Sequence, residues 1–122
     1  MKVLKSCHLF GMFFLAQPLA VFAQTTGEAQ FDTVTYVCER GVEIPVTYIS
    51  TDANAYAVAM IEGRQIAMEQ ARAGSGVLYV SIDEQASYRW HTKGDDATLS
   101  FLAADHTAEE ETLLRECTTP DA

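Results

Sequence analysis

The sequence predicts an all-β fold, either a barrel or a sandwich. Eight short runs rich in β-branched and aromatic residues follow one another at a spacing of roughly 8–12 residues, with turn residues between them. The chain has 122 residues, which suits one domain, and its 48% of hydrophobic residues excludes a wholly disordered protein. The predicted strands span residues 31–38, 42–49, 56–61, 64–70, 77–82, 88–93, 97–102 and 112–117.

The first two predicted strands follow from alternating side chains. Val34, Tyr36 and Cys38 share one face of the first run. In the second run, Ile44 lies on the apolar face and Pro45 on the opposite face. Because proline has no N–H to donate to a ladder, we expect this strand to lie at a sheet edge or to carry a bulge.

The third and fourth predicted strands form a hairpin around Glu62-Gly63, which reads as a tight turn. A helix over residues 61–73 is the competing interpretation, because those residues have good helix propensity. Gly63 and the period of two that joins Ile66 to Met68 favour the strand.

Turn residues also separate the last four predicted strands. Gly74-Ser75-Gly76 precedes the fifth run, and Gly94-Asp95-Asp96 separates the sixth from the seventh. Residues 106–111 form a charged connector before the eighth run, and we expect one helical turn there.

Residues 1–23 are typical of a secretory signal peptide. Lys2 and Lys5 supply the positive start, an apolar stretch follows, and Val21-Phe22-Ala23 is a small-x-small cleavage site. The apolar stretch is too short and interrupted for a membrane span, and no cysteine lies just after it to carry a lipid, since Cys7 precedes it. We therefore expect a soluble periplasmic protein with a flexible arm at residues 24–30 and one domain at residues 31–122.

The net charge of the chain is strongly negative. It is −9 for the whole sequence and −11 once residues 1–23 are removed. Such a surface repels phosphate and excludes a basic nucleic-acid binder. It favours either plain solubility or a basic partner, and Lys93 is the only lysine left after the leader.

Two cysteines remain in the exported chain, Cys38 and Cys117. An even number of cysteines in an exported protein indicates a disulfide, whereas the wide spacing argues against a metal site. The loop-entropy relation gives about 4.5 kcal/mol for closing a loop of this length. We therefore expect the bridge to contribute strongly to a domain with a modest core.

Catalytic chemistry has little support in the sequence. His91 and His106 lie in different segments and outside any motif, and no serine lies in a nucleophile elbow. The carboxylate clusters at Asp95-Asp96 and 109–111 lack the spacing of a calcium loop. We expect no enzyme activity, no metal and no cofactor.

Four short motifs in order nevertheless resemble a known family. Tyr36-x-Cys38, Ser75-Gly76-x-x-Tyr79, Lys93-Gly94-Asp95-x-Ala97 and a terminal Cys117 are similar to the MliC/PliC family, bacterial inhibitors of c-type lysozyme. The resemblance covers about residues 34–117. It implies an antiparallel barrel of eight strands and a protein that protects the bacterial cell wall.

The resemblance also implies a binding site. Ser75 and Lys93 would be inserted into the active-site cleft of c-type lysozyme, and Tyr79 would support the loop or touch the rim of the cleft. Cys38 and Cys117 match the family's bridge. No nucleic acid or membrane span is expected, and a homodimer through exposed edge strands is left open.

The sequence departs from the family pattern at two places. Val77-Leu78 replace a common Ala-Arg pair, so any contact of that arginine is in doubt. His91 holds a position where members often carry tryptophan, with Trp90 one residue earlier. We hypothesise that His91 makes binding sensitive to pH, and unchanged inhibition between pH 5.5 and 8 would remove that hypothesis.

A small-ligand-binding periplasmic β-barrel is the alternative function. Eight strands can enclose one small ligand. Ala57, Ala59, Met60 and Met68 could leave room for one, although packed cores explain them equally well. A filled interior would oppose this alternative.

Overall fold

The computed structural model describes residues 11, 14–18, 20 and 27–120. Most of the predicted signal peptide, including its lysines and its cleavage site, lies outside the described residues. So do residues 24–26 of the predicted arm. The leader, the cleavage point and the domain limits therefore remain predictions.

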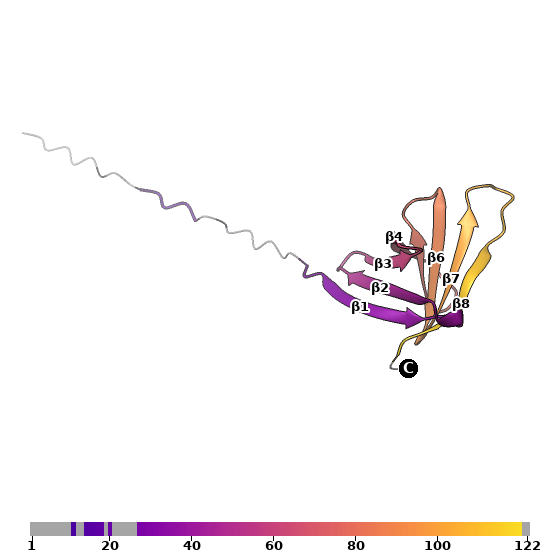
Figure 1. Ribbon diagram of the computed structural model, residues 1–122. Helices are drawn as coiled ribbons and strands as arrows, with labels where there is room; N and C mark the ends of the chain where they lie inside the picture. The colour runs from indigo at the N-terminus through magenta and orange to yellow at the C-terminus, as the bar shows by residue number, and fades with distance from the viewer. Residues whose placement is uncertain (1–10, 12–13, 19, 21–26, 121–122) are drawn as a thin grey trace, which may run out of the picture.

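The eight strands form one closed antiparallel barrel in sequence order, which confirms the expected all-β class (Figure 1). Each strand pairs with the next along the chain, and the first also pairs with the last. Figure 1 shows β1–β3 running across the direction of β6–β8. The strands are β1 (Gln30–Val37), β2 (Glu43–Ser50), β3 (Ala55–Ile61), β4 (Arg64–Ala71), β5 (Val77–Ser81), β6 (Ala86–Lys93), β7 (Asp96–Ala103) and β8 (Glu111–Thr118), with a short 3-10 turn η1 (Glu39–Gly41) after β1.

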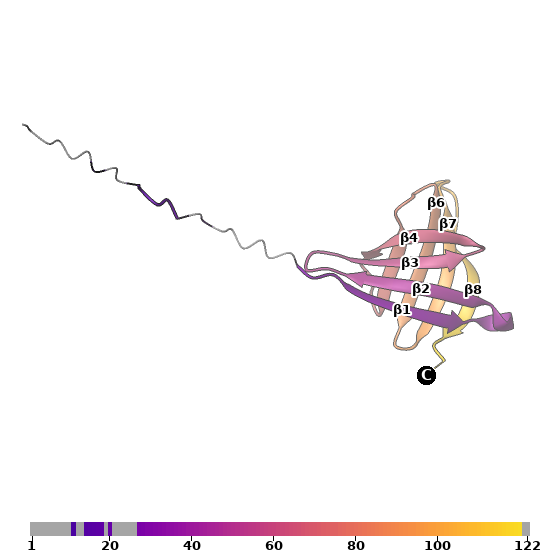
Figure 2. The same ribbon diagram turned by 60° about the vertical axis from the view of Figure 1, so that its left-hand side comes forward.

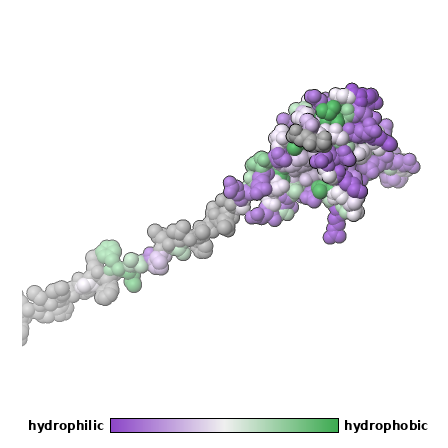
Figure 3. All heavy atoms as spheres, turned by 90° about the horizontal axis from the view of Figure 1, so that it is seen from below, coloured by the Kyte–Doolittle hydropathy of each residue, from purple (hydrophilic) through white to green (hydrophobic). Residues whose placement is uncertain are grey.

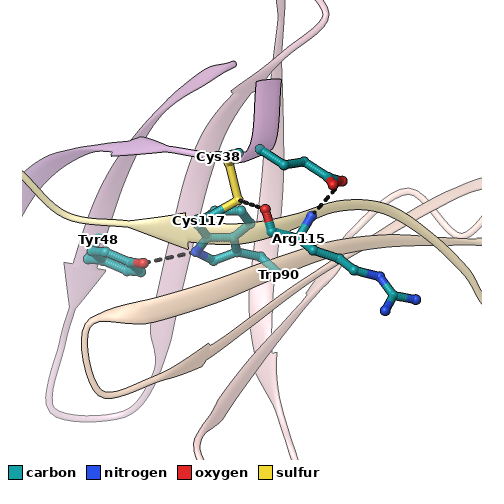
Figure 4. Close-up of a disulfide and its surroundings, with 6 residues drawn as sticks. Cys38, Tyr48, Trp90, Arg115 and Cys117 are labelled. Carbon is teal, nitrogen blue, oxygen red and sulfur yellow. Dashed lines mark hydrogen bonds between the residues drawn. A yellow bond between two sulfur atoms is a disulfide. The ribbon is translucent and has the colours of Figure 1, made fainter. Parts of the chain in front are cut away.

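The barrel closes through a very short ladder between its first and last strands. The only partners that join β1 to β8 are Val37 and Thr118. The disulfide between Cys38 and Cys117 lies directly beside this pair, and it confirms the predicted bridge (Figure 4). The covalent link therefore adds to a seam that has few backbone hydrogen bonds of its own.

The fourth element is a strand and not a helix, as the period of two indicated. β4 pairs with both β3 and β5. Glu62 and Gly63 both have positive φ, 51° and 75°, which is the backbone of a type I′ hairpin turn. The predicted turn at this position is thus confirmed.

Two local expectations are wrong. β2 is neither an edge nor bulged, because it pairs with β1 and with β3 in an unbroken register. The β2–β3 ladder instead covers Val46–Ser50 and so leaves out Pro45, the residue just before Val46, which pairs only with Thr35 of β1. Residues 106–111 form a turn and an extended segment without a helix, and the Asp105 carboxylate accepts the Thr107 N–H there.

The one irregular register lies between β7 and β8. Ser100 pairs with Thr112, Leu99 with Leu114 and Ala97 with Cys117, so β8 carries an extra residue at two places, the second of them between Leu114 and Cys117. Glu116 has a φ of 54° within this bulge. A bulge of this kind re-aims the side chains that follow it. Here it leaves Cys117 fully buried at the position that reaches Cys38.

The interior is packed with side chains from all around the barrel. The largest fully buried residues are Trp90, Met68, Leu99, Val46 and Cys117. Ala57 and Ala59 are fully buried in the same cluster, and Ala57 is the cross-strand neighbour of Met68. The face in Figure 3 is mostly hydrophilic, with apolar residues in small separate patches. Among the described residues, no helix has the length and apolar character to cross a membrane.

Candidate functional site

Two connections lie side by side at one end of the β5–β6 pair. We call residues 72–76, between β4 and β5, the Ser75 loop, and residues 93–96, between β6 and β7, the Lys93 turn. In the β5–β6 register, Val77 lies opposite Thr92. The end of the Ser75 loop, where β5 begins, therefore lies beside the end of β6, where the Lys93 turn begins. Figure 2 shows this β6–β7 hairpin at the lower edge of the barrel, close to the C-terminus.

Both predicted contact residues are exposed at this end. The side chain of Ser75 lies on a bend outside the strands, and Lys93 is the last residue of β6. Among the described residues, Lys93 has no ion-pair partner, although Asp96 is its cross-strand neighbour. The structure therefore presents one hydroxyl and one unpaired ammonium from adjacent connections.

A histidine fastens the Ser75 loop to β6. The His91 Nε2 atom lies 2.8 Å from the Ser75 carbonyl oxygen. A carbonyl only accepts, so Nε2 carries the hydrogen and donates it. The imidazole comes from the outer face of β6, opposite Leu78 of β5.

Gly76 lets the loop approach β6 closely. Its φ is +67°, and a Cβ atom added there would collide with the Thr92 carbonyl and meet the His91 Nε2 atom at 3.2 Å. Glycine is thus needed here both for its backbone conformation and for its lack of a side chain. Gly74, two residues earlier, has open space around it and an ordinary backbone.

Tyr79 belongs to the buried core of the barrel. Its side chain is only 8% exposed, and its ring lies 5.6 Å from that of Tyr48. Burial raises the pKa of Tyr79. Support of the loop fits this buried position, and both roles of Tyr79 remain predictions.

A hydrogen-bonded aromatic cluster lies beneath the exposed end. The Trp90 indole N–H donates to the Tyr48 hydroxyl over 2.9 Å (Figure 4). That hydroxyl also shares a 2.7 Å hydrogen bond with the Tyr36 hydroxyl. The rings of Tyr36 and Trp90 meet edge to face at 5.0 Å. Burial, followed by the bond with Tyr36, raises the pKa of Tyr48 far above its ordinary value.

A groove of about 410 Å³ runs along the outer face of the barrel beside the Ser75 loop. Arg89 lies in it with its side chain half-buried, and its guanidinium is 3.9 Å from Glu110. The Ser100 hydroxyl donates to the same carboxylate over 2.6 Å. The groove is lined by Ala73, Gly74, Leu78, Arg89, His91, Thr98, Ser100, Glu110 and Thr112.

Sequence reasoning missed how these residues cooperate. It treated His91 as a departure from the family pattern that could make binding sensitive to pH, and Gly76 as part of a turn and of a motif, without connecting either residue to the position of the Ser75 loop. The positive φ and the close approach to β6 arise from tertiary packing, which a single sequence does not display. The nearest available signal was the pair of glycines around Ser75.

These features define a class of small binding protein. A barrel closed by one disulfide presents two exposed connections at one end, and the described residues include no group of three or more potential metal ligands. The family described as "Membrane-bound lysozyme-inhibitor of c-type lysozyme" (MliC) matches residues 36–108, more than half of the chain. The chain belongs to this family.

Solved structures of two relatives agree with the assignment. The periplasmic lysozyme inhibitor of c-type lysozyme from Salmonella typhimurium, PliC-St, is 28% identical, with a TM-score of 0.61 over 74% of this chain and 98% of that chain. MliC from Pseudomonas aeruginosa, crystallised with hen egg white lysozyme, is 25% identical, with a TM-score of 0.54 over 71% of this chain and 86% of that chain. No curated protein matches the chain.

The family membership answers the question of enzyme activity. The family consists of lysozyme inhibitors and not of enzymes, and its names cover both periplasmic and membrane-bound members.

Proposed function

We propose that this protein inhibits c-type lysozyme by inserting Ser75 and Lys93 into the active-site cleft of the enzyme. The observation that carries the proposal is the exposure of both side chains from neighbouring connections. The resemblance of the motifs around them to the MliC/PliC family supports these roles. So does the relative that was crystallised with hen egg white lysozyme.

The chemistry of the cleft suits these two side chains. C-type lysozyme works with two carboxyl groups, of which one stays protonated and the other ionised. The Lys93 ammonium would donate a charge-assisted hydrogen bond to the ionised group, worth roughly 1.5–3 kcal/mol net. The Ser75 hydroxyl can both donate and accept, so it can serve either carboxyl group. Inhibition then needs only occupation of the cleft, with no reaction by the inhibitor.

The charge of the inhibitor would speed its association with a basic enzyme. The predicted exported chain carries −11, and Lys93 is its only lysine. Opposite net charges raise the association rate, and added salt screens that effect. We therefore expect the association rate to fall as ionic strength rises, while the dissociation rate changes less.

The proposed place of action is the periplasm. The predicted signal peptide would export the chain, and the disulfide suits an oxidising compartment. There the protein would protect the bacterial cell wall from lysozyme.

Purified protein should test the proposal directly. Wild type should block lysis of cell walls by hen egg white lysozyme, and Lys93→Ala or Ser75→Ala should weaken the block, with a loss of roughly 10- to 100-fold for Lys93→Ala. Arg64→Ala is the matched control, because it also removes one exposed cation but lies at the opposite end of β4. If Lys93→Ala and Ser75→Ala both inhibit as well as wild type, the site assignment is wrong even if the function stands.

The small-ligand alternative gains no support from the interior. Ala57, Ala59 and Met68 are fully buried in the packed core, together with Trp90.

A further inference from the structure

We propose that His91 is a positioning residue that holds the Ser75 loop in the conformation needed for binding. This inference rests on the proposed function, since it concerns how Ser75 is presented. His91 itself would not need to contact the reacting groups of the enzyme. It would act through its hydrogen bond to the carbonyl of Ser75, the residue that makes the contact.

The first support is the hydrogen bond itself. His91 Nε2 donates to the Ser75 carbonyl at 2.8 Å, a normal length for an N–H···O bond. Within the described part of the chain, no other side chain forms a hydrogen bond with residues 72–76. The backbone bonds that lie outside the strands do not involve these residues either. This one bond therefore joins the tip of the loop to the rigid barrel.

The second support is steric and independent of the first. Gly76 presses against the backbone of Thr92, and the space that a side chain would take there is bounded by the His91 ring. The loop is thus fixed on two sides, by the donor from His91 and by the close approach at Gly76. Both contacts come from the last residues of β6, next to Lys93.

The geometry links the two inserted side chains. His91 lies two residues before Lys93 on the same face of β6, because side chains alternate along a strand. A residue that binds the Ser75 carbonyl from this position fixes the loop relative to Lys93. An inhibitor that must place both groups in one cleft gains affinity when their relative position is set before binding.

The bond can form in either protonation state of the ring, and the charged imidazolium donates the stronger bond, which is how His91 would make binding sensitive to pH. Nε2 carries a hydrogen in the required neutral tautomer and also in the charged imidazolium. We therefore expect His91 to hold the loop in both states. Its role is to supply a donor in a fixed place.

Three variants separate this role from a general effect on folding. His91→Phe keeps a flat ring but removes the donor, whereas His91→Gln keeps a donor of similar reach. Thr98→Val is the matched control, because Thr98 is the cross-strand neighbour of His91 on β7 and lines the same groove without bonding to the loop. We expect His91→Phe to weaken binding of hen egg white lysozyme roughly 2- to 10-fold, mainly through faster dissociation. We expect His91→Gln and Thr98→Val to stay near wild type.

A double-mutant cycle tests whether His91 acts through Ser75. The losses from His91→Phe and Ser75→Ala should be clearly less than additive when combined, because a misplaced loop already loses the serine contact. Equal affinity of wild type and His91→Phe would overturn the inference, and so would equal losses for His91→Phe and His91→Gln, or full additivity.

A measurement without lysozyme keeps the inference separate from the proposed function. Backbone order parameters of residues 74–76 in the free protein should fall in His91→Phe and remain near wild type in His91→Gln. Unchanged order in His91→Phe would overturn the inference even if the wild type inhibits lysozyme. If the wild type fails to inhibit, the proposed function falls, while this measurement still decides whether His91 orders the loop.

Discussion

The buried centre of the barrel and its exposed β5–β6 end satisfy their polar groups in different ways. In the centre, the Trp90 indole and the hydroxyls of Tyr48 and Tyr36 bond to one another, and dense packing surrounds them. At the exposed end, one histidine bond fixes the Ser75 loop and the Lys93 ammonium has no ion-pair partner within the described chain. The polar groups in the centre therefore have their partners within the protein. The groups at the exposed end are free to bind a second protein.

This contrast predicts that stability and binding can be changed separately. Changes in the centre should lower the free energy of unfolding and leave the affinity of the folded fraction nearly intact. Changes at the β5–β6 end should do the reverse, because exposed loops contribute little to packing.

The largest expected effect is on stability and comes from the disulfide. Replacing both Cys38 and Cys117 by alanine, or reducing the bridge, should lower the free energy of unfolding by up to about 4.5 kcal/mol. The physical reason is the larger freedom of the unfolded chain once 79 residues are no longer closed into a loop. Urea denaturation followed by Trp90 fluorescence measures the change. An identical curve with and without reductant would contradict it.

The next effect comes from the hydroxyl at the centre. Tyr48→Phe leaves the Trp90 N–H and the Tyr36 hydroxyl without their shared partner, which should cost about 1–3 kcal/mol of stability. The matched control is Tyr56→Phe, because Tyr56 lies on β3 and has no hydrogen bond from its hydroxyl among the described residues. Equal losses of unfolding free energy in the two variants would show that the hydrogen bonds of the Tyr48 hydroxyl do not stabilise the fold.

A pair of glycines tests the exposed end. Gly76→Ala should weaken lysozyme binding, because its left-handed backbone costs roughly 1–2 kcal/mol with a side chain and its Cβ would push against Thr92. Gly74→Ala has neither problem and should bind like wild type. Affinities of both variants, measured together with their melting temperatures, check the prediction. Similar binding by the two variants would mean that the close approach at Gly76 does not matter.

The smallest effect is a loss of stability in alkaline solution. The pKa of Tyr48 is raised in the folded protein, so the folded state keeps its proton where the unfolded state, with a pKa near 10, loses it. The contribution of Tyr48 to the free energy of unfolding is fully present below about pH 10. It is lost as the pH rises further, by at most about 1.4 kcal/mol per pH unit. Unfolding curves at pH 8 and pH 11 measure it. Tyr48→Phe should show a smaller pH dependence, and an equal one would assign the effect to other groups.

Much of the fold could be predicted from local pattern. All eight strands were located to within two residues at each end, because alternation and turn residues are properties of short segments. The bridge between Cys38 and Cys117 was predicted because an exported chain with two cysteines has few other choices. The correct choice of strand for β4 rested on Ile66 and Met68, whose period of two outweighed helix propensity.

The remaining features depend on contacts between distant segments. Pro45 suggested an edge strand, but the structure accommodates it by ending the β2–β3 ladder one residue away. The burial of Tyr79 and the bond from His91 follow from which strands become neighbours, which local pattern does not reveal. The motif resemblance identified the exposed residues, Ser75 and Lys93, without showing what holds them.

The register between β5 and β6 determines which side chains face the core and which face the Ser75 loop. Tyr79 lies opposite Trp90 inside the barrel, and Leu78 lies opposite His91 outside it. A slip of one residue in this pairing would exchange the two faces, so that a tyrosine would leave the core and the histidine would turn away from the loop. The number of residues between Ser75 and Tyr79 therefore cannot change without losing the alignment of both.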